Sequence, residues 1–567
     1  MGTCKEVVIQ ESEEILSTIT NLCNKLLQIY KTEFTDLKSS LTLSELLEFL
    51  KNLPGVNSFY ETFLTFMANP NYKSYANEIY QDFLQDYQEH QEIYTSFKKQ
   101  WHKILNFITT LEQQKKQNLI FSFNNWLDLI KQQSLLFASS EIINTTINSD
   151  GKNLLNGIKN CLSDLVINNG YFNIKTNDLK AFTIGKNLAA TPGKIIYQND
   201  LMELIQYSPT TEQVYKTPLL IIPPCINKYY VLDLSAKNSL VQWLVEQGFI
   251  VYMISWNNPG PELAYKEFSD YVTDGPLKAV DIITKINSCS GIHTVGYCIG
   301  GTLLGCMLSY MEQLKDPRIL SATHFMSLLD FSNLGDVGLF INENILNFVE
   351  KLINKKGYFD GRLLSMSFNT LRPNDLIWPY FINNYLLDKP LQAFDVLYWN
   401  SDPTNLPANM YKFYLRNLCF KNLLCKPNGV IINGVPIDLT KVTTPVFSLA
   451  GIKDHITPWQ GVYASAQLYS GPSQFVLSSS GHVKGLINPP TDNKYSFRIN
   501  IINKKIPKNH QVWLKNSTEH QGSWWNYWKN WLNNISFEKI NVKQSSALVN
   551  INVLRDAPGS YVLKKCI

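Results

Sequence analysis

Short apolar runs alternate with helical stretches from about residue 186 onward, and this alternation restricts the possible folds most strongly. We expect buried strands in TPLLIIPP, FIVYMISW, GIHTVGY, THFMSLL, TPVFSLAG and SQFVLSS. Between the first two runs, a helix is expected to open at Ser235 and close at Gly248, and residues 269–288 predict another helix after the second run. Such an order is typical of an α/β fold, in which helices cover a mostly parallel sheet.

The pattern is different before this region and in its middle. Residues 1–185 carry apolar residues at three- and four-residue spacing, as in LTLSELLEFLKNL, and predict a helical N-terminal domain. In residues 186–567, which predict the second domain, the alternation lapses between about 331 and 436. Because sheet ligands bind at the edge where such an insertion emerges, we expect it to form a cap over the site. The tryptophans of SWWNYWKNWL favour packing over binding.

Charge and composition exclude several classes of function. The 51 basic and 47 acidic residues give a net charge of only +4, which argues against nucleic acid as a partner. The first residues are acidic and no run of 18 apolar residues follows, so we expect a cytoplasmic chain with no membrane span. Ten cysteines without CxxC spacing indicate neither a disulfide framework nor a structural zinc site, and we expect no metal and no cofactor.

The segment VGYCIGGTLL combines a Gly-x-Cys-x-Gly pattern with a change from strand to helix. The strand is expected to end at Tyr297, and GTLLGCMLSYMEQL continues as a helix. Glycines on both sides allow the tight turn that exposes a nucleophile, and the start of a helix favours a thiolate. Cys298 is therefore the candidate nucleophile. The alternative is a small buried thiol, which is the usual state of a free cysteine.

A nucleophilic thiol needs a base, and the base needs an orienting partner. Asp454 follows one predicted strand and His482 follows the next, so both are expected at the carboxyl edge of the sheet with Cys298. The order nucleophile, acid, histidine is the one that α/β-hydrolases use. The alternatives are a helix cap for Asp454 and an exposed loop residue for His482. His455, next to the acid, is a weaker second candidate.

The oxyanion hole of such an enzyme is made of backbone N–H groups. We expect one donor from Ile299, the residue after the nucleophile, and one from Ile226 in the loop IIPPCINKYY after the first strand. Cys225 lies in the same loop but has no elbow around it, so we interpret it as a packing residue.

With these residues placed, the chain resembles the polyhydroxyalkanoate synthases, specifically the class I poly(3-hydroxybutyrate) polymerases. The resemblance runs from roughly residue 100 to the C-terminus and is carried by FTIGKNLAATPGKIIYQNDLMELIQY, GYCIGGTLL, LRPNDLIWPYFINNYLL, YWNSDPTNLP, KDHITPW, SGHVKGLINPP and GSWWNYWKNWL. It implies an α/β-hydrolase-type sheet with a cap insertion, preceded by the helical domain. The chain departs from the family pattern at Cys225, Asn257 and Gly260, outside the three candidate catalytic positions.

The resemblance also implies an activity. Such enzymes polymerise (R)-3-hydroxyacyl-CoA, chiefly 3-hydroxybutyryl-CoA, release CoA and sit on cytoplasmic storage granules. Cys298 would hold the acyl chain, His482 would take the thiol proton, and Asp454 would orient His482 or help to activate the attacking 3-hydroxyl. Arg372 and His455 are the expected substrate-binding side chains. A homodimer, the growing polyester and granule-associated proteins are the expected partners.

Two other functions stay open at this point. An acyl-CoA thioesterase would use the same residues but let water attack the acyl-enzyme. A granule-coating scaffold would keep the fold without the chemistry, and an inactive relic should have lost at least one of Cys298, Asp454 and His482. All three stand in their motifs.

Overall fold

The computed structural model describes residues 139–149, 151–168, 173–500, 506–545 and 552–566. These residues divide into two compact units. The helical unit holds the described residues up to Asn177 together with Asn369–Gln392, and the sheet unit holds Asp178–Phe368 and the described residues from Ala393 onward. Most of the predicted N-terminal domain, residues 1–138, lies outside the described residues, so its boundary at 185 stays a prediction.

The helical unit joins two segments that are far apart in the sequence. Its helices are α6 (Ser140–Asn148), α7 (Lys152–Ile167), α14 (Pro373–Leu376), α15 (Trp378–Phe381) and the π-helical η6 (Ile382–Leu386). The Tyr385 hydroxyl donates to the Asp164 carboxylate at 2.8 Å, and the Asn153 amide donates to the Leu386 carbonyl at 2.6 Å. Part of the insertion predicted at 331–436 therefore packs with α7.

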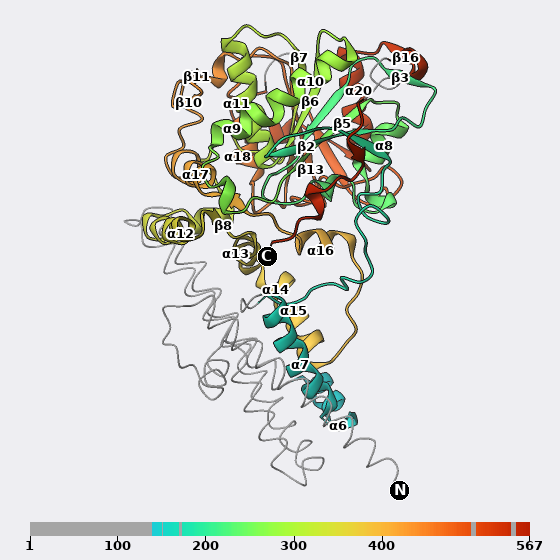
Figure 1. The fold of residues 1–567 in the computed structure, drawn as a ribbon, viewed down its shortest axis with the longest axis vertical. Helices are drawn as coiled ribbons and strands as arrows, with labels where there is room; N and C mark the ends of the chain where they lie inside the picture. The colour runs from blue at the N-terminus through green and yellow to red at the C-terminus, as the bar shows by residue number, and fades with distance from the viewer. Residues whose placement is uncertain (1–138, 150, 169–172, 501–505, 546–551, 567) are drawn as a thin grey trace. The chain divides into compact units, whose positions relative to one another are not determined.

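One mixed sheet joins eleven strands of the sheet unit (Figure 1). Their spatial order is β15 (Thr518–Gln521), β14 (Ser496–Ile499), β13 (Ser473–Ser478), β12 (Val446–Gly451), β7 (Ile319–Phe325), β6 (Ile292–Tyr297), β4 (Leu219–Ile222), β5 (Val251–Trp256), β2 (Met202–Tyr207), β1 (Gly193–Gln198) and β17 (Arg555–Asp556). The run from β13 to β5 is parallel, and the strands beyond it on both sides pair antiparallel. The six predicted strands are confirmed, and they form this parallel run.

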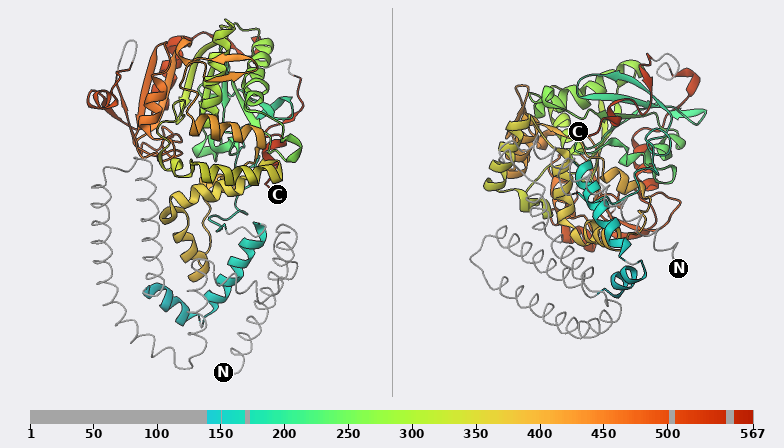
Figure 2. Two further views of the ribbon diagram at one scale, coloured as in Figure 1. Left: turned by 90° about the vertical axis from the view of Figure 1, so that its left-hand side faces the viewer. Right: turned by 60° about the horizontal axis from the view of Figure 1, so that its bottom comes forward.

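Helices cover both faces of the sheet (Figures 1 and 2). The side chains of β4 alternate between the two faces, and both faces are buried. Leu219 and Ile221 belong to the apolar cluster on one face, and Leu220 and Ile222 belong to the cluster on the other. One cluster includes side chains of α10 (Lys278–Asn287), α11 (Ile299–Gln313) and α18 (Trp459–Ala466). The other includes α8 (Leu240–Glu246) and α20 (Trp525–Ile535). The sheet is therefore apolar on both faces, as a parallel sheet requires.

The predicted start of one helix was wrong by four residues. α8 begins at Leu240, and its cap is Ser239, whose hydroxyl accepts from the Gln242 N–H at 2.9 Å. Ser235 instead donates to the Asp395 carboxylate, and residues 236–238 form the short 3-10 turn η2. Both serines fit the capping preference, so sequence alone did not separate them. The helix predicted over 269–288 is confirmed as α9 (Phe268–Val272), the π-helical η4 (Thr273–Leu277) and α10.

The rest of the insertion is mostly helical. Most of its helices lie at one end of the sheet, and its hairpin at residues 430–437 lies beside α11 (Figures 1 and 2). It contains η5 (Gly335–Phe340), α12 (Glu343–Lys356), β8 (Tyr358–Phe359), α13 (Gly361–Leu371), α16 (Asp395–Asn400), β9 (Leu406–Pro407), α17 (Ala408–Phe413), the π-helical η7 (Tyr414–Phe420) and the hairpin β10 (Val430–Ile432) with β11 (Val435–Ile437). We use the name cap segment for the described residues 331–368 and 393–436. Among the described helices, none has the length and apolar character needed to cross a membrane.

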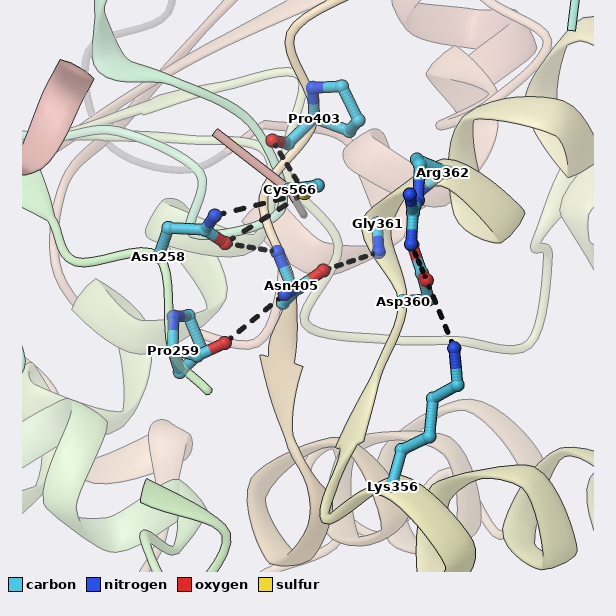
Figure 3. Close-up of polar contacts among 9 residues, drawn as sticks. All are labelled: Asn258, Pro259, Lys356, Asp360, Gly361, Arg362, Pro403, Asn405 and Cys566. Carbon is cyan, nitrogen blue, oxygen red and sulfur yellow. Dashed lines mark hydrogen bonds and ion pairs between the residues drawn. The ribbon is translucent and has the colours of Figure 1, made fainter. Parts of the chain in front are cut away.

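The C-terminal residues tie the cap segment to the sheet. The Cys566 thiol lies against the Pro403 carbonyl and the Asn258 amide, and Asn258 also accepts from the Asn405 backbone N–H at 2.8 Å (Figure 3). The Asn405 side chain in turn accepts from the Gly361 N–H, where α13 begins. Asn258 follows β5, so this chain of bonds runs from the sheet to the cap segment.

Candidate active site

Cys298 occupies a sharp turn between β6 and α11. Its backbone angles are φ 53° and ψ −125°, a conformation that side-chain-bearing residues rarely adopt. The Cys298 N–H donates to the Phe325 carbonyl on β7 at 2.9 Å, which anchors the turn to the neighbouring strand. This strand, strained residue and helix form the geometry of a nucleophile elbow, which presents the central side chain above the sheet.

The glycines around Cys298 are required by close packing. A Cβ at Gly296 would collide with the Cα of Gly301, and a Cβ at Gly300 would overlap the carbonyl oxygen of Ile222. The turn can therefore close only because the residues two positions before and two positions after Cys298 are glycines.

Asp454 and His482 lie in the loops that follow β12 and β13. Because β6, β12 and β13 belong to the parallel run, all three candidate residues stand beyond the carboxyl ends of their strands. The His482 Nδ1 lies 2.7 Å from the Asp454 Oδ2, and the charge of Cys298 contributes to the raised pKa of the His482 imidazole. The structure thus brings together, at one edge of the sheet, the three side chains that the sequence predicted.

Burial and charge oppose each other in this cluster. Burial disfavours a charged His482, but the charges of Asp454 and Cys298 and hydrogen bonds to both raise the pKa of the imidazole to about 10. Burial likewise disfavours a charged Asp454, but its interactions with His482 and Thr457 hold the pKa of the carboxyl below its usual value. The balance favours a carboxylate on Asp454 beside a protonated imidazole on His482.

Asp454 has a second set of partners in its own loop. Its Oδ1 accepts from the backbone N–H groups of Ile456 at 2.9 Å and Thr457 at 3.0 Å. The loop leads into α18, whose cap position is Pro458. Asp454 therefore shapes the turn before the helix without capping it, and its other oxygen contacts His482.

Thr457 also contacts the candidate catalytic residues, although the sequence did not predict a role for it. Its hydroxyl donates to the Asp454 Oδ2 at 2.7 Å and lies 3.2 Å from the His482 Nδ1. The signal for it is a threonine three residues after an acid in DHIT, which is a common local pattern. Only the folded loop shows that its hydroxyl also reaches the imidazole.

The remaining predicted residues have different settings. Ile226 and Ile299 border the same cavity as Cys298, and the Ile299 N–H, at the first position of α11, has no partner within the helix. The backbone carbonyl of His455 accepts from the Asp336 N–H at 3.0 Å. Arg372 belongs to the helical unit and forms an exposed ion pair with Asp375. The roles of these four residues stay predictions.

Cys225 differs from Cys298 in its surroundings. Its side chain is buried, and burial raises the pKa of the thiol far above its ordinary value. A thiol held in its neutral form is a poor nucleophile.

An apolar cavity lies over Cys298. The core contributes Ile226, Cys298, Ile299, Ile456 and Thr457 to its wall. The cap segment contributes most of the other lining, including Phe340, Ile345, Val349, Leu364, Phe368, Tyr411, Tyr414, Leu415 and Cys419. The thiol therefore faces a space lined mainly by hydrocarbon. Within the described residues, no cluster of side chains is suited to hold a metal ion.

The fold and the site define an α/β-hydrolase with cysteine at the elbow. The family model for the alpha/beta hydrolase fold matches residues 218–489, and the model for the N-terminus of poly-beta-hydroxybutyrate polymerase (PhaC) matches residues 73–244. The predicted fold class is confirmed.

Curated relatives extend this result over most of the chain. The poly(3-hydroxyalkanoate) polymerase of Methylorubrum extorquens is 39% identical over 458 residues, which cover 80% of this chain and 74% of the relative. The PhaC polymerase subunits of Rhizobium etli and Cupriavidus necator are 36% and 35% identical, over 82% and 79% of this chain and 72% and 76% of their own lengths. The chain belongs to the poly(3-hydroxyalkanoate) polymerase family. The enzyme class expected from the sequence, a polyhydroxyalkanoate synthase, is confirmed.

Proposed function

We propose that the chain polymerises (R)-3-hydroxyacyl groups from CoA thioesters, chiefly 3-hydroxybutyryl-CoA, through a covalent acyl-thioester on Cys298. Cytoplasmic granules of the product are its proposed location, with a homodimer as the working form and granule-associated proteins as neighbours. The observation that carries the proposal is the strained Cys298 elbow at the same edge of the sheet as the hydrogen-bonded His482–Asp454 pair.

In the first step the Cys298 sulfur attacks the thioester carbonyl. His482 holds the proton given up by the Cys298 thiol and passes it to the sulfur of the departing CoA, so the C–S bond to Cys298 replaces the C–S bond to CoA. Exchange between two thioesters is nearly balanced in energy, which keeps the acyl group available for transfer. The Ile299 and Ile226 N–H groups are the proposed donors to the oxyanion.

In the second step a 3-hydroxyl oxygen attacks the acyl-enzyme. His482 removes the hydroxyl proton, an ester bond forms, and the Cys298 sulfur leaves. The 2.7 Å contact between Asp454 and His482 supports an orienting role for the acid, rather than direct activation of the hydroxyl. An apolar cavity walled by the cap segment favours attack by a substrate hydroxyl over attack by water.

The competing function is an acyl-CoA thioesterase, in which water attacks the acyl-enzyme. The two functions separate on incubation with 3-hydroxybutyryl-CoA, because a thioesterase releases free thiol and soluble acid without insoluble polymer. A non-catalytic scaffold would release no thiol at all, and its expected loss of a catalytic residue is not found at Cys298, Asp454 or His482.

The decisive experiment is expression in a host that lacks its own synthase, with polymer analysis and CoA release followed together. Polymer should accumulate with the wild-type chain. Cys298→Ala should abolish turnover and leave the protein folded, and His482→Gln should lower the rate at least about a hundredfold through loss of the general base. Polymer synthesis by folded Cys298→Ala would remove the core of the proposal.

A further inference from the structure

Thr457 lies beside the candidate catalytic residues but has no role in the two proposed steps. Its side chain is buried beside the candidate catalytic residues and borders the cavity over Cys298. The Thr457 Oγ1 lies 2.7 Å from the Asp454 Oδ2 and 3.2 Å from the His482 Nδ1, while these two atoms lie 2.7 Å from each other. The hydroxyl thus completes a triangle with the carboxylate and the imidazole.

The number of protons in this triangle fixes the direction of each bond. An ionised Asp454 can only accept, and its pKa is held below the usual value, so both the Thr457 hydroxyl and the His482 Nδ1 must donate to it. The Thr457 hydroxyl donates its proton to Asp454, so its oxygen can accept a hydrogen bond from the Nδ1–H of His482. His482 therefore shares one proton between two oxygens, and its Nε2 is left for the Cys298 thiol.

The groups that face His482 come from several elements. Asp454 and Thr457 come from the loop after β12, and Cys298 comes from the elbow after β6. The ring of Tyr297 lies 5.3 Å from the imidazole ring between centroids, inclined by 33°. Among these groups, the Thr457 hydroxyl is the one neutral hydrogen-bonding partner of Nδ1, and removing it changes no formal charge.

We propose that Thr457 is a positioning residue for the proposed reaction, whose hydroxyl holds the Asp454 carboxylate and the His482 Nδ1–H in one arrangement so that Nε2 serves Cys298. The inference rests on the proposed function for its catalytic meaning. It adds a fourth side chain to the candidate catalytic group, and it acts through His482 rather than on the substrate.

The test compares two substitutions that separate the hydroxyl from the methyl group. Thr457→Val keeps the shape and removes the hydroxyl, and we expect kcat to fall about tenfold with KM changed less than about twofold, the size of one lost hydrogen bond to a charged group. Thr457→Ser keeps the hydroxyl and should retain about half of the activity or more. CoA release from 3-hydroxybutyryl-CoA supplies both parameters.

A second readout reports on His482 directly and does not depend on turnover. The His482 imidazole is followed by NMR of histidine-labelled protein and assigned through His482→Gln. Thr457→Val should lower the pKa of His482 by about one unit, because the imidazolium loses an acceptor, while Thr457→Ser should leave it near the wild-type value. Thr294→Val is the matched control, since it removes another buried threonine hydroxyl, bonded to the Ser321 carbonyl, away from the triangle.

The outcomes separate the two proposals. If Thr457→Val matches wild type in both kcat and the His482 titration, the inference is overturned. If Thr294→Val lowers kcat as much as Thr457→Val, the effect is general loosening and the inference also fails. If Thr457→Val does not fold, Thr457→Ala takes its place, and its kcat and the pKa of its His482 are measured in the same way. Retained synthesis in Cys298→Ala would instead contradict the proposed function and leave the His482 titration as the test of the triangle.

Discussion

At the scale of single residues, Cys298 holds a backbone conformation that costs on the order of 1 to 3 kcal/mol. The surroundings force this conformation, because Gly296 and Gly300 allow the strand and the helix to approach and the Phe325 carbonyl holds the Cys298 N–H. The result is a side chain presented beyond the sheet edge. The GYCIGG pattern predicts this geometry because a glycine on each side of the cysteine allows the tight turn of a nucleophile elbow.

His482 gives a pH dependence whose sign can be worked out. Its pKa is about 10 in the folded chain against an ordinary value of 6.5, so the folded state binds the proton more tightly. The stabilising contribution is complete below about pH 6.5 and is lost as the pH rises through about 10. We expect the difference in unfolding free energy between wild type and His482→Gln to shrink over this window, measured by urea unfolding. A difference that grows with pH would contradict the assignment.

At the scale of elements, the parallel run of the sheet was predictable, while its five antiparallel strands and the loops were not. The short apolar runs predicted the six parallel strands, because an uninterrupted apolar segment of that length is typical of a strand buried on both faces. The α8 cap at Ser239, the Thr457 contact with His482 and the packing of Asn369–Gln392 with α7 depend on where the chain turns in space. Local sequence patterns at these places permit several structures of similar energy.

The tryptophan helix α20 supports the loop that carries His482. The Trp524 indole N–H donates to the Gly485 carbonyl at 2.9 Å, and the Trp525 indole N–H donates to the Leu486 carbonyl at 3.0 Å. Both side chains are buried, which confirms the expected packing role. The helix therefore fixes the backbone three and four residues beyond His482.

We expect Trp525→Phe to lower the unfolding free energy by about 2 kcal/mol, because the Leu486 carbonyl loses its donor and a smaller ring fills the space. Turnover should fall severalfold as the His482 loop loosens. Trp531→Phe on the same helix is the control, since that ring packs on Phe447 and no bond to the His482 loop is involved. Equal losses of turnover in both variants would show that the loop bond is unimportant.

At the scale of the whole molecule, the C-terminal residues hold the sheet unit together. The buried Glu203 carboxylate on β2 accepts from the Ser560 N–H and hydroxyl and from the Tyr561 N–H. Further along, Lys565 pairs with Asp402 of the cap segment at 2.8 Å. The last described residues thus bind both strand β2 of the sheet and the cap segment that walls the cavity.

Glu203→Gln tests this attachment. The amide nitrogen cannot accept the hydrogen bonds that reach one of the carboxylate oxygens, so we expect a loss of about 3 kcal/mol in unfolding free energy. Glu538→Gln is the control, because Glu538 forms an exposed pair with Lys216 and should change stability by less than about 1 kcal/mol. Chemical unfolding of both variants supplies the comparison, and similar losses would contradict a special role for the C-terminal attachment.

The covalent bond between the acyl group and Cys298 is the central step of the proposed reaction. Brief incubation with 3-hydroxybutyryl-CoA, acid quenching and mass analysis of proteolytic peptides would locate any acyl group on the chain. We expect a 3-hydroxybutyryl adduct, or a short oligomer of it, on the peptide that contains Cys298, and no adduct after Cys298→Ala. Polymer formation with the Cys298 peptide unmodified, or with the acyl group on another residue, would contradict this step.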